Sequence, residues 1–228
     1  MTQTHGIVFA APGTPNVMEL RQYPLRAAGP EEITVAIEAA GVNFIDLHRR
    51  SGALDDGSAF PRGLGMEGAG RVVECGSQVE NLAIGDRVAF VDSSTGSYAG
   101  HAVVRASRAI RLPDDVPSEV AAGVMFKGLT AEYLTHRCVP LAPGNFVVWH
   151  AAAGGVGSIA TSWLVARGVR VIGLASTEAK RRQVLDAGCI AALDAEAPDT
   201  LGLIHELTDG KGAHVAVSYT HLTLPTKA

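Results

Sequence analysis

The sequence predicts two domains of different fold class, a small β barrel or sandwich and an α/β domain on a parallel sheet. Three observations carry this prediction. Short strand-like runs between glycine and polar turns fill the chain as far as about Pro117. From about residue 146, strands alternate with helices of ten or so residues, which is the pattern of βαβ units. A glycine-rich turn joins the first strand and the first helix of that second part.

Strands dominate the first part. Apolar side chains alternate at Ile33, Val35 and Ile37, as on a strand with one buried face. One helix is expected over 44–50, because Asn43 is a good N-cap and Gly52 ends the run. Further strands are expected over 70–74, 87–91 and 101–105.

The second part begins with a helix over 127–137, and Ser118 is a candidate N-cap before it. Pro140 and the Pro143-Gly144 pair then break the chain. The alternation that follows predicts strand 146–151, helix 156–167, strand 169–174, helix 178–187, a short strand at 190–193, helix 199–208 and strand 213–217.

Composition excludes several classes of protein. A chain of 228 residues that is 47% hydrophobic and 18% charged is long enough to bury proper cores. The 19 Lys and Arg against 23 Asp and Glu leave a net charge of -4, which argues against nucleic acid and membrane surfaces as partners. No apolar run has the length of a membrane span, and the first residues do not form a signal peptide. Three dispersed cysteines favour reduced thiols, so we expect a cytoplasmic protein.

The sharpest motif is Ala151-Ala152-Ala153-Gly154-Gly155-Val156-Gly157, between a predicted strand and a predicted helix. A pyrophosphate must come close to the backbone amides at a helix N-terminus, and Gly154 and Gly155 remove side chains that would block it. Gly157 would let the helix pack closely on the strand. The sequence therefore predicts a dinucleotide site, although a purely structural turn is the alternative.

The end of the second strand of this part indicates which dinucleotide. An NAD site commonly has an acid there, but this chain reads Gly173-Leu174-Ala175-Ser176-Thr177, with Lys180, Arg181 and Arg182 following. Lys180 is placed to meet a 2′-phosphate, which favours NADP. The alternative is a solvated basic face on a helix that Thr177 caps. No zinc or other metal site is expected, because ligands do not cluster in the first part.

Five ordered blocks resemble the zinc-independent quinone oxidoreductases of the medium-chain dehydrogenase/reductase superfamily, relatives of zeta-crystallin. The resemblance covers residues 1 to about 217 and implies a GroES-like barrel domain over 1–125. It also implies a partial Rossmann domain, a doubly wound parallel sheet, over 126–217, with the active site in the cleft between them. The blocks are Ala40-Gly41-Val42-Asn43-Phe44-Ile45-Asp46 with Arg50-Ser51-Gly52, Gly63 to Gly70, Gly85-Asp86-Arg87-Val88, Lys127-Gly128-Leu129-Thr130-Ala131, and His150 to Gly157.

By this likeness Asn43 and Thr130 contact the nicotinamide, residues 154–157 (Gly154, Gly155, Val156, Gly157) hold the pyrophosphate, and Ser176 with Lys180 meets the 2′-phosphate. His48 stands where the family usually has a tyrosine, and it is our candidate proton donor. The other readings are structural ones. In these readings Asn43 only caps a helix, and the charge of Asp46 only offsets the dipole at the first turn of that helix. Lys127 is a surface residue, and Thr130 caps a helix or packs against its neighbours.

The resemblance implies an enzyme that transfers a hydride from NADPH to a small-molecule quinone or conjugated carbonyl without zinc. The alternatives are an NADPH-dependent enoyl or alkenal reductase, and a non-catalytic NADPH-binding protein of the crystallin type. Residues 218–228 have no likeness to the family, and we expect them to derive from outside its reading frame after a truncation. We therefore expect low solubility and little turnover for this chain. The resemblance also implies a homodimer for the protein at full length.

Overall fold

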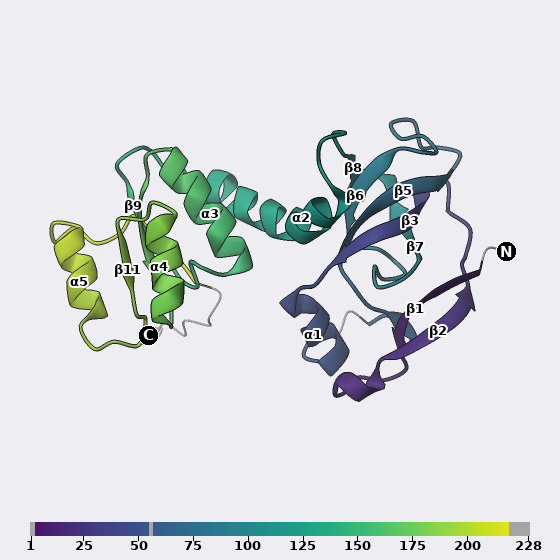
Figure 1. The fold of residues 1–228 in the computed structure, drawn as a ribbon, viewed down its shortest axis with the longest axis horizontal. Helices are drawn as coiled ribbons and strands as arrows, with labels where there is room; N and C mark the ends of the chain where they lie inside the picture. Colours follow the sequence, from purple (N-terminus) through teal and green to yellow (C-terminus); the bar gives the residue numbers. More distant parts are fainter. Residues whose placement is uncertain (1–2, 55–56, 219–228) are drawn as a thin grey trace, which may run out of the picture. The chain divides into compact units, whose positions relative to one another are not determined.

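The computed structural model describes residues 3–54 and 57–218, which form two compact units (Figure 1). The first unit extends to Phe126 and the second begins at Lys127, within one helix. No helix in the described part of the chain combines the length and the apolar character of a membrane span.

Two antiparallel sheets form the first unit. A five-stranded sheet has the order β7-β3-β5-β6-β8, and a three-stranded sheet has the order β2-β1-β4. Apolar side chains of the larger sheet, among them Ile33, Val35 and Phe90, form a buried cluster. The elements are β1 (Gln3–Phe9), η1 (Pro15–Val17), β2 (Glu19–Pro24), β3 (Glu32–Gly41), α1 (Phe44–Ser51), β4 (Arg62–Gly63), β5 (Glu67–Cys75), β6 (Arg87–Val91), β7 (His101–Arg105), η2 (Ala106–Arg108) and β8 (Ala109–Arg111).

The predicted elements of this unit are confirmed, and two long strands were not predicted. Asn43 is the N-cap of α1 and has an extended backbone. The helix ends before Gly52, whose backbone is left-handed with φ 84°. Strands β1 and β2 were not predicted because the pattern of buried side chains along them does not match the pattern of apolar residues. The inward positions of β1 include Thr4 and Gly6, and almost all of β2 is exposed.

The helix that links the two units is longer than predicted. We expected helix over 127–137 with Ser118 as a separate cap, but α2 runs without a break over Ser118–Glu132 and continues as a π-helical turn over Tyr133–Arg137. Ser118 is the first helical residue, and its hydroxyl donates to Glu38 at 2.5 Å. The helix is extended at its N-terminal end because buried Ala121 and Ala122 pack in an apolar cluster with the larger sheet.

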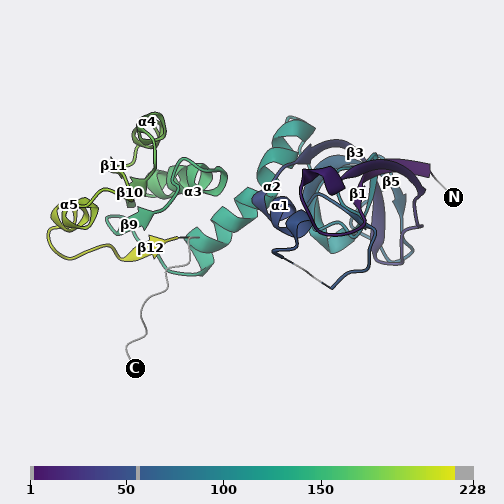
Figure 2. The same cartoon turned by 90° about the horizontal axis from the view of Figure 1, so that it is seen from below.

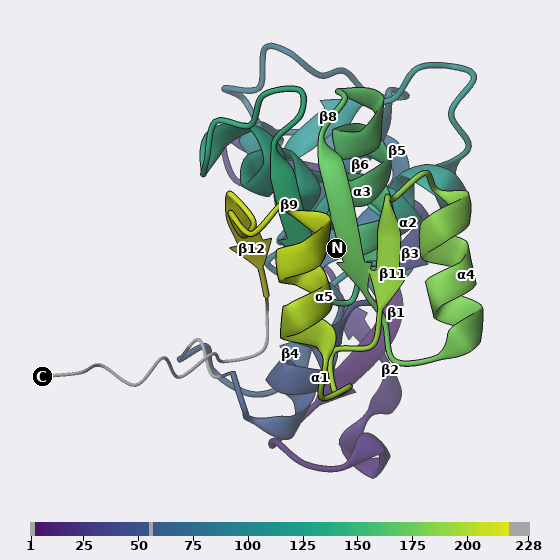
Figure 3. The ribbon, with the colours of Figure 1, turned by 90° about the vertical axis from the view of Figure 1, so that its left-hand side faces the viewer.

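The second unit is a four-stranded parallel sheet in the order β11-β10-β9-β12 (Figure 2). Figure 3 shows β10 and β11 side by side, running in the same direction. All its predicted strands and helices are confirmed to within a few residues at their ends. They are β9 (Phe146–Trp149), α3 (Gly155–Ala166), β10 (Arg170–Leu174), α4 (Glu178–Asp186), β11 (Ala191–Leu193), α5 (Thr200–Leu207) and β12 (Val215–Val217).

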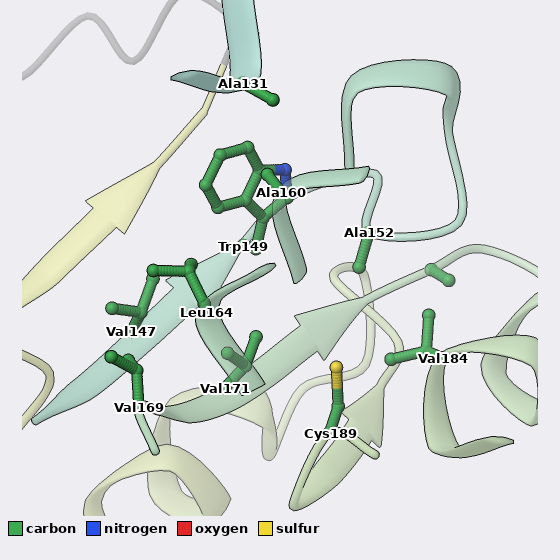
Figure 4. Close-up of a cluster of buried hydrophobic side chains, with 11 residues drawn as sticks. Ala131, Val147, Trp149, Ala152, Ala160, Leu164, Val169, Val171, Val184 and Cys189 are labelled. Atoms are coloured by element: carbon green, nitrogen blue, oxygen red, sulfur yellow. The ribbon is translucent and has the colours of Figure 1, made fainter. Parts of the chain in front are cut away.

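Helices cover both faces of this sheet, as a doubly wound architecture requires. Side chains of α3, α4 and the end of α2 pack with one set of strand residues, and α5 packs with the alternate set. Trp149, with 1% of its surface exposed, is the largest fully buried side chain among the described residues. Figure 4 shows its ring beside Ala131 of α2 and Ala160 of α3. The end of β9 is therefore held against two helices.

A bidentate ion pair in the first unit predicts an acid-sensitive component of stability. Arg26 donates to both carboxylate oxygens of Glu32 at 2.6 and 2.8 Å, which lowers the pKa of Glu32 to about 2. A depressed folded-state pKa stabilises the fold above the ordinary value near 4.5 and loses that effect as pH falls toward 2. Because Arg26 is 47% exposed, screening limits the contribution to about 1 kcal/mol.

We therefore expect Glu32→Gln to lower the free energy of unfolding by about 1 kcal/mol at pH 7 and to leave it nearly unchanged at pH 2. Urea denaturation at a series of pH values measures this. Glu19→Gln is the control, because Glu19 and its partner Arg21 are about half exposed. An equal loss for the two variants at every pH would contradict the prediction.

Candidate functional site

The glycine turn of the second unit leaves the start of α3 open. Strand β9 ends at Trp149, and Gly154 is the N-cap of α3 with an extended backbone and no side-chain capping bond. The N–H groups of the first helical turn have no partner inside a helix, so they are available to an anion. Gly154 and Gly155 are both exposed. The turn can therefore receive a group that needs several amide donors.

Gly157 has a different role from the two exposed glycines. It is buried, and a Cβ at this position would lie 2.4 Å from the carbonyl oxygen of Ala151 and 2.7 Å from that of Ala152. Both atoms belong to the backbone, so they cannot move aside as a side chain would. Gly157 therefore allows α3 to approach the turn after β9 closely, whereas the approach predicted for it was to the strand.

The turn also carries an unusual backbone conformation. Ala151 has φ 50°, which is unfavourable for a residue with a Cβ. Its carbonyl accepts the N–H of Gly154 at 2.8 Å, and the N–H of Ala152 donates to Leu174 at 3.1 Å. These bonds place the turn beside the C-terminal end of β10, where the predicted 2′-phosphate residues follow.

Ser176 and Lys180 are both exposed, at the end of β10 and in the first turn of α4. Thr177 is the N-cap of α4, and its hydroxyl accepts the N–H of Lys180 at 3.3 Å. The capping role considered for Thr177 is confirmed. Capping does not involve the Lys180 side chain, which remains free to meet a ligand.

The three basic side chains at this helix start are not equivalent. Arg181 pairs with Asp194 at 3.1 Å, and Arg182 pairs with Asp186 at 3.4 Å. Within the described residues, only Lys180 of the three has no ion-pair partner. Arg181 also pairs with Glu178 in the first turn of α4 at 3.1 Å. Lys180 is therefore the basic side chain of the three that can pair with an anionic ligand without giving up an ion pair among the described residues.

Helix α2 supplies two further side chains of the second unit. Thr130 is half-buried, about one turn beyond Lys127. A Cβ on Gly155 would lie 2.8 Å from Cδ and 3.1 Å from Cε of Lys127, so the lysine stem passes over the start of α3. Lys127 was not predicted as a site residue. The glycine at 155 has a second use, which is to leave room for this stem.

Asn43, in the first unit, is held by two buried acids. Its backbone N–H donates to Asp46 at 2.9 Å, and its side-chain Nδ2 donates to Glu67 at 2.8 Å. Tyr98 donates to the same oxygen of Asp46 at 2.7 Å. Burial raises the pKa of Asp46, and burial together with the bond to Asp46 raises the pKa of Tyr98 above its ordinary value. Asn43 is thus both a helix cap by position and part of a buried polar network.

His48 lies on α1 but outside this network. Its side chain is exposed, whereas Asn43 is 7% exposed. No hydrogen bond among the described residues joins the His48 ring to Asn43 or Glu67. Within the described part of the first unit, the two candidate catalytic residues therefore share no hydrogen bond.

Neither a metal-binding cluster nor a cavity coincides with the predicted site in the described part of the chain. The described residues contain no group of three or more His, Cys, Asp or Glu side chains that could hold a metal ion. A cavity of about 580 Å³ in the first unit is lined by Phe9, Tyr23, Arg49 and Arg62, among others. None of the predicted site residues lines this cavity. It therefore gives no support to the predicted dinucleotide site.

Two family models match the chain. One, described as the alcohol dehydrogenase GroES-like domain, matches residues 29–137, and the other, described as zinc-binding dehydrogenase, matches residues 155–223. A quinone oxidoreductase of Pseudomonas aeruginosa is 42% identical over 205 residues, which are 90% of this chain and 63% of that protein. A 2-haloacrylate reductase of Burkholderia is 34% identical over 89% of this chain and 62% of that protein.

Solved structures give the same picture. The quinone oxidoreductase of Escherichia coli, solved in complex with NADPH, superposes with a TM-score of 0.89 and 35% identity, over 94% of this chain and 65% of that one. The predicted fold class, a GroES-like domain with a Rossmann-type parallel sheet, is confirmed. The chain spans somewhat less than two thirds of the length of these relatives.

Proposed function

We infer that the chain belongs to the quinone oxidoreductase family of the medium-chain dehydrogenase/reductase superfamily, and we propose that it binds NADPH for hydride transfer to a quinone. The similar protein from Escherichia coli was solved with NADPH, which supports this choice of cofactor. Because the chain covers only part of its relatives, the proposal concerns the activity of the protein to which these two units belong.

One observation carries the proposal. The open start of α3 and the uncommitted Lys180 ammonium lie at the ends of adjacent strands, β9 and β10. A dinucleotide with a 2′-phosphate needs amide donors for its pyrophosphate and a cation near its adenosine ribose. The sequence supplies both, and no acid follows β10 directly to repel the extra phosphate.

We assign the pyrophosphate to the first turn of α3, at residues 154–157, and the 2′-phosphate to Ser176 and Lys180. When bound, NADPH supplies the hydride from C4 of its reduced nicotinamide. Asn43 and Thr130 are proposed as contacts of the nicotinamide half, on the family resemblance. Their hydrogen-bonding groups would orient the ring and exclude competing water.

The proton that completes the reduction of a quinone must come from a donor near the acceptor oxygen. We propose the exposed imidazole of His48 for this role, with solvent as the other source. Donors aimed at the developing oxyanion would stabilise it. A loss of quinone turnover in His48→Phe with an unchanged Kd for NADPH would support this assignment, and unchanged turnover would contradict it.

An NADPH-dependent reductase of conjugated acids or alkenals is the second candidate. It is favoured by the 34% identity to a 2-haloacrylate reductase, whose name states a conjugated substrate. The cofactor site would be unchanged, so only the acceptor distinguishes the two. Turnover of a naphthoquinone against a 2-alkenal, by a chain completed to the length of its relatives, decides between them.

We expect Lys180→Ala to raise the Kd for NADPH by about 10- to 100-fold and to change the Kd for NADH by less than about twofold. The reason is that the ammonium meets only the 2′-phosphate, which NADH lacks. Fluorescence titration of both cofactors measures this. Arg182→Ala is the matched control, because Arg182 is already paired with Asp186.

An unchanged preference for NADPH in Lys180→Ala would remove Lys180 from the site. Failure of the unaltered chain to bind either cofactor would contradict the proposed function for these two units. Tight NADPH binding without consumption in the presence of any acceptor, by the completed chain, would favour the non-catalytic, crystallin-like alternative.

We also propose a cytoplasmic location, because the three cysteines are unpaired thiols. A homodimer is proposed for the protein at the length of its relatives, and light scattering on such a chain would test it. The acidic net charge of -4 supports a small-molecule partner over nucleic acid.

A further inference from the structure

A fully buried carboxylate occupies the first position of β5. Glu67 is 0% exposed, and across the sheet it faces Gly41 of β3 and Val91 of β6. A Cβ on Gly41 would lie 2.4 Å from Oε1 of Glu67, so this glycine leaves the space that the carboxylate fills. Buried charges are stable only when they are hydrogen bonded or paired. The hydrogen-bond donors to Glu67 therefore indicate which groups its carboxylate holds in place.

Two donors from different segments converge on this carboxylate. Nδ2 of Asn43 donates to Oε1 at 2.8 Å, and the backbone N–H of Phe126 donates to Oε2 at 2.6 Å. Asn43 precedes α1, whereas Phe126 lies within α2. Glu67 thus ties a side chain at the start of one helix to the backbone of another.

The bond fixes which way round the Asn43 amide lies. A carboxylate only accepts hydrogen bonds, so a flipped amide would set Oδ1 of Asn43 against Oε1 of Glu67 and lose the bond. The backbone of Asn43 is held as well, because its N–H donates to Asp46, which Tyr98 anchors. Both ends of the residue are therefore fixed before any ligand binds.

We propose that Glu67 is a positioning residue, which holds Nδ2 of Asn43 so that Oδ1 is presented as an acceptor to the cofactor. The ligand group that meets Oδ1 is then a donor, such as a sugar hydroxyl or a carboxamide N–H. This inference rests on the proposed contact between Asn43 and the nicotinamide half of NADPH. Glu67 acts through Asn43 and does not touch the reacting atoms.

Glu67→Gln is the test variant, because it keeps the shape and removes one acceptor. The donors from Asn43 and Phe126 bond to different oxygens of Glu67, and an amide replaces one of these oxygens with an NH2 that only donates, so one of the two bonds is lost. Glu74→Gln is the matched control. Glu74 lies on the same strand and accepts a hydrogen bond from Thr34 at 2.8 Å, but it is exposed.

The first experiment uses no cofactor. In the ¹⁵N spectrum of the chain, the Asn43 side-chain peaks are identified by their loss in Asn43→Ala. We expect one Nδ2 proton to exchange with solvent at least about tenfold more slowly than in an exposed asparagine. Glu67→Gln should abolish this protection and Glu74→Gln should retain it.

Wild-type Asn43 peaks that behave like those of an exposed asparagine would overturn the proposal, as would unchanged protection in a folded Glu67→Gln chain. If Glu67→Gln does not fold, the wild-type exchange rate decides.

The second experiment is a double-mutant cycle on the Kd for NADPH. We expect Glu67→Gln to weaken binding about five- to tenfold in the wild-type background and less than about twofold in the Asn43→Ala background. An undiminished loss in the second background would show a merely structural role and would overturn the proposal. Absence of NADPH binding by the wild type would count against the proposed function alone, since the first experiment still judges Glu67.

Discussion

Gly157→Ala is expected to destabilise the second unit by about 3 kcal/mol and to weaken NADPH binding by more than about tenfold. The added Cβ would lie 2.4 and 2.7 Å from the backbone carbonyl oxygens of Ala151 and Ala152, and relief requires α3 to move away from the turn that follows β9. That movement displaces the first-turn amides on which the pyrophosphate site depends. Urea denaturation followed by tryptophan fluorescence, and NADPH titration, measure the two effects.

Gly202→Ala is the matched control for the same substitution. Gly202 lies in α5 of the same unit, and nothing lies within 4 Å of the position a Cβ would take. Alanine there should raise the free energy of unfolding by about 0.5 kcal/mol, because glycine is the poorer helix former. A Gly157→Ala chain as stable as wild type, with unchanged NADPH affinity, would show that the close approach has no bearing on the site.

Trp149→Ala is expected to have the largest effect on stability, a loss of about 3–5 kcal/mol. The ring is 1% exposed and packs in the cluster formed by β9, α2 and α3 (Figure 4). Its removal leaves a cavity at the point where three elements meet, just before the glycine turn. Chemical denaturation followed by circular dichroism measures the loss, because the fluorescence of this ring is removed.

The chain contains a second tryptophan that provides the control. Trp163, on α3, is 39% exposed, and its ring has an edge contact with His136 at a centroid distance of 6.2 Å. Trp163→Ala should therefore lower stability by less than about 1 kcal/mol. Equal losses from the two substitutions would mean that the buried cluster does not dominate the stability of this unit.

Much of the fold was predictable from the sequence because each βα unit carries its own local signals. Periodic apolar residues, Thr177 at a helix start and glycines at turns gave every strand and helix of the second unit. Strands β1 and β2 were not predictable in this way. They pair with each other, β1 also pairs with the distant β4, and hydropathy does not mark which of their residues are buried.

The part of the candidate site that uses backbone amides, the start of α3, could be predicted from the sequence. Gly154 and Gly155 mark the open start of α3 in the sequence, because neither has a side chain that could cover the helix amides. Lys127 and Glu67 were not assigned a role from the sequence, because their contacts depend on long-range packing. The stem of Lys127 crosses Gly155, and Glu67 accepts hydrogen bonds from Asn43 and from the backbone of α2. An acid inside an apolar, glycine-rich run was the available signal for Glu67.

The order of the parallel sheet affects how the second unit is assembled during translation. Strand β9 is the first strand of this sheet to be synthesised, and in the folded sheet it lies between β10 and β12. Its partner residues on β12 follow 68 residues later in the chain, as in the pair Val147 and Val215. At synthesis rates of about 5–20 residues per second, one edge of this apolar strand waits roughly 3 to 14 seconds for its second neighbour. During that interval the nascent chain exposes an unpaired edge of an apolar strand, to which chaperones that recognise extended segments can bind.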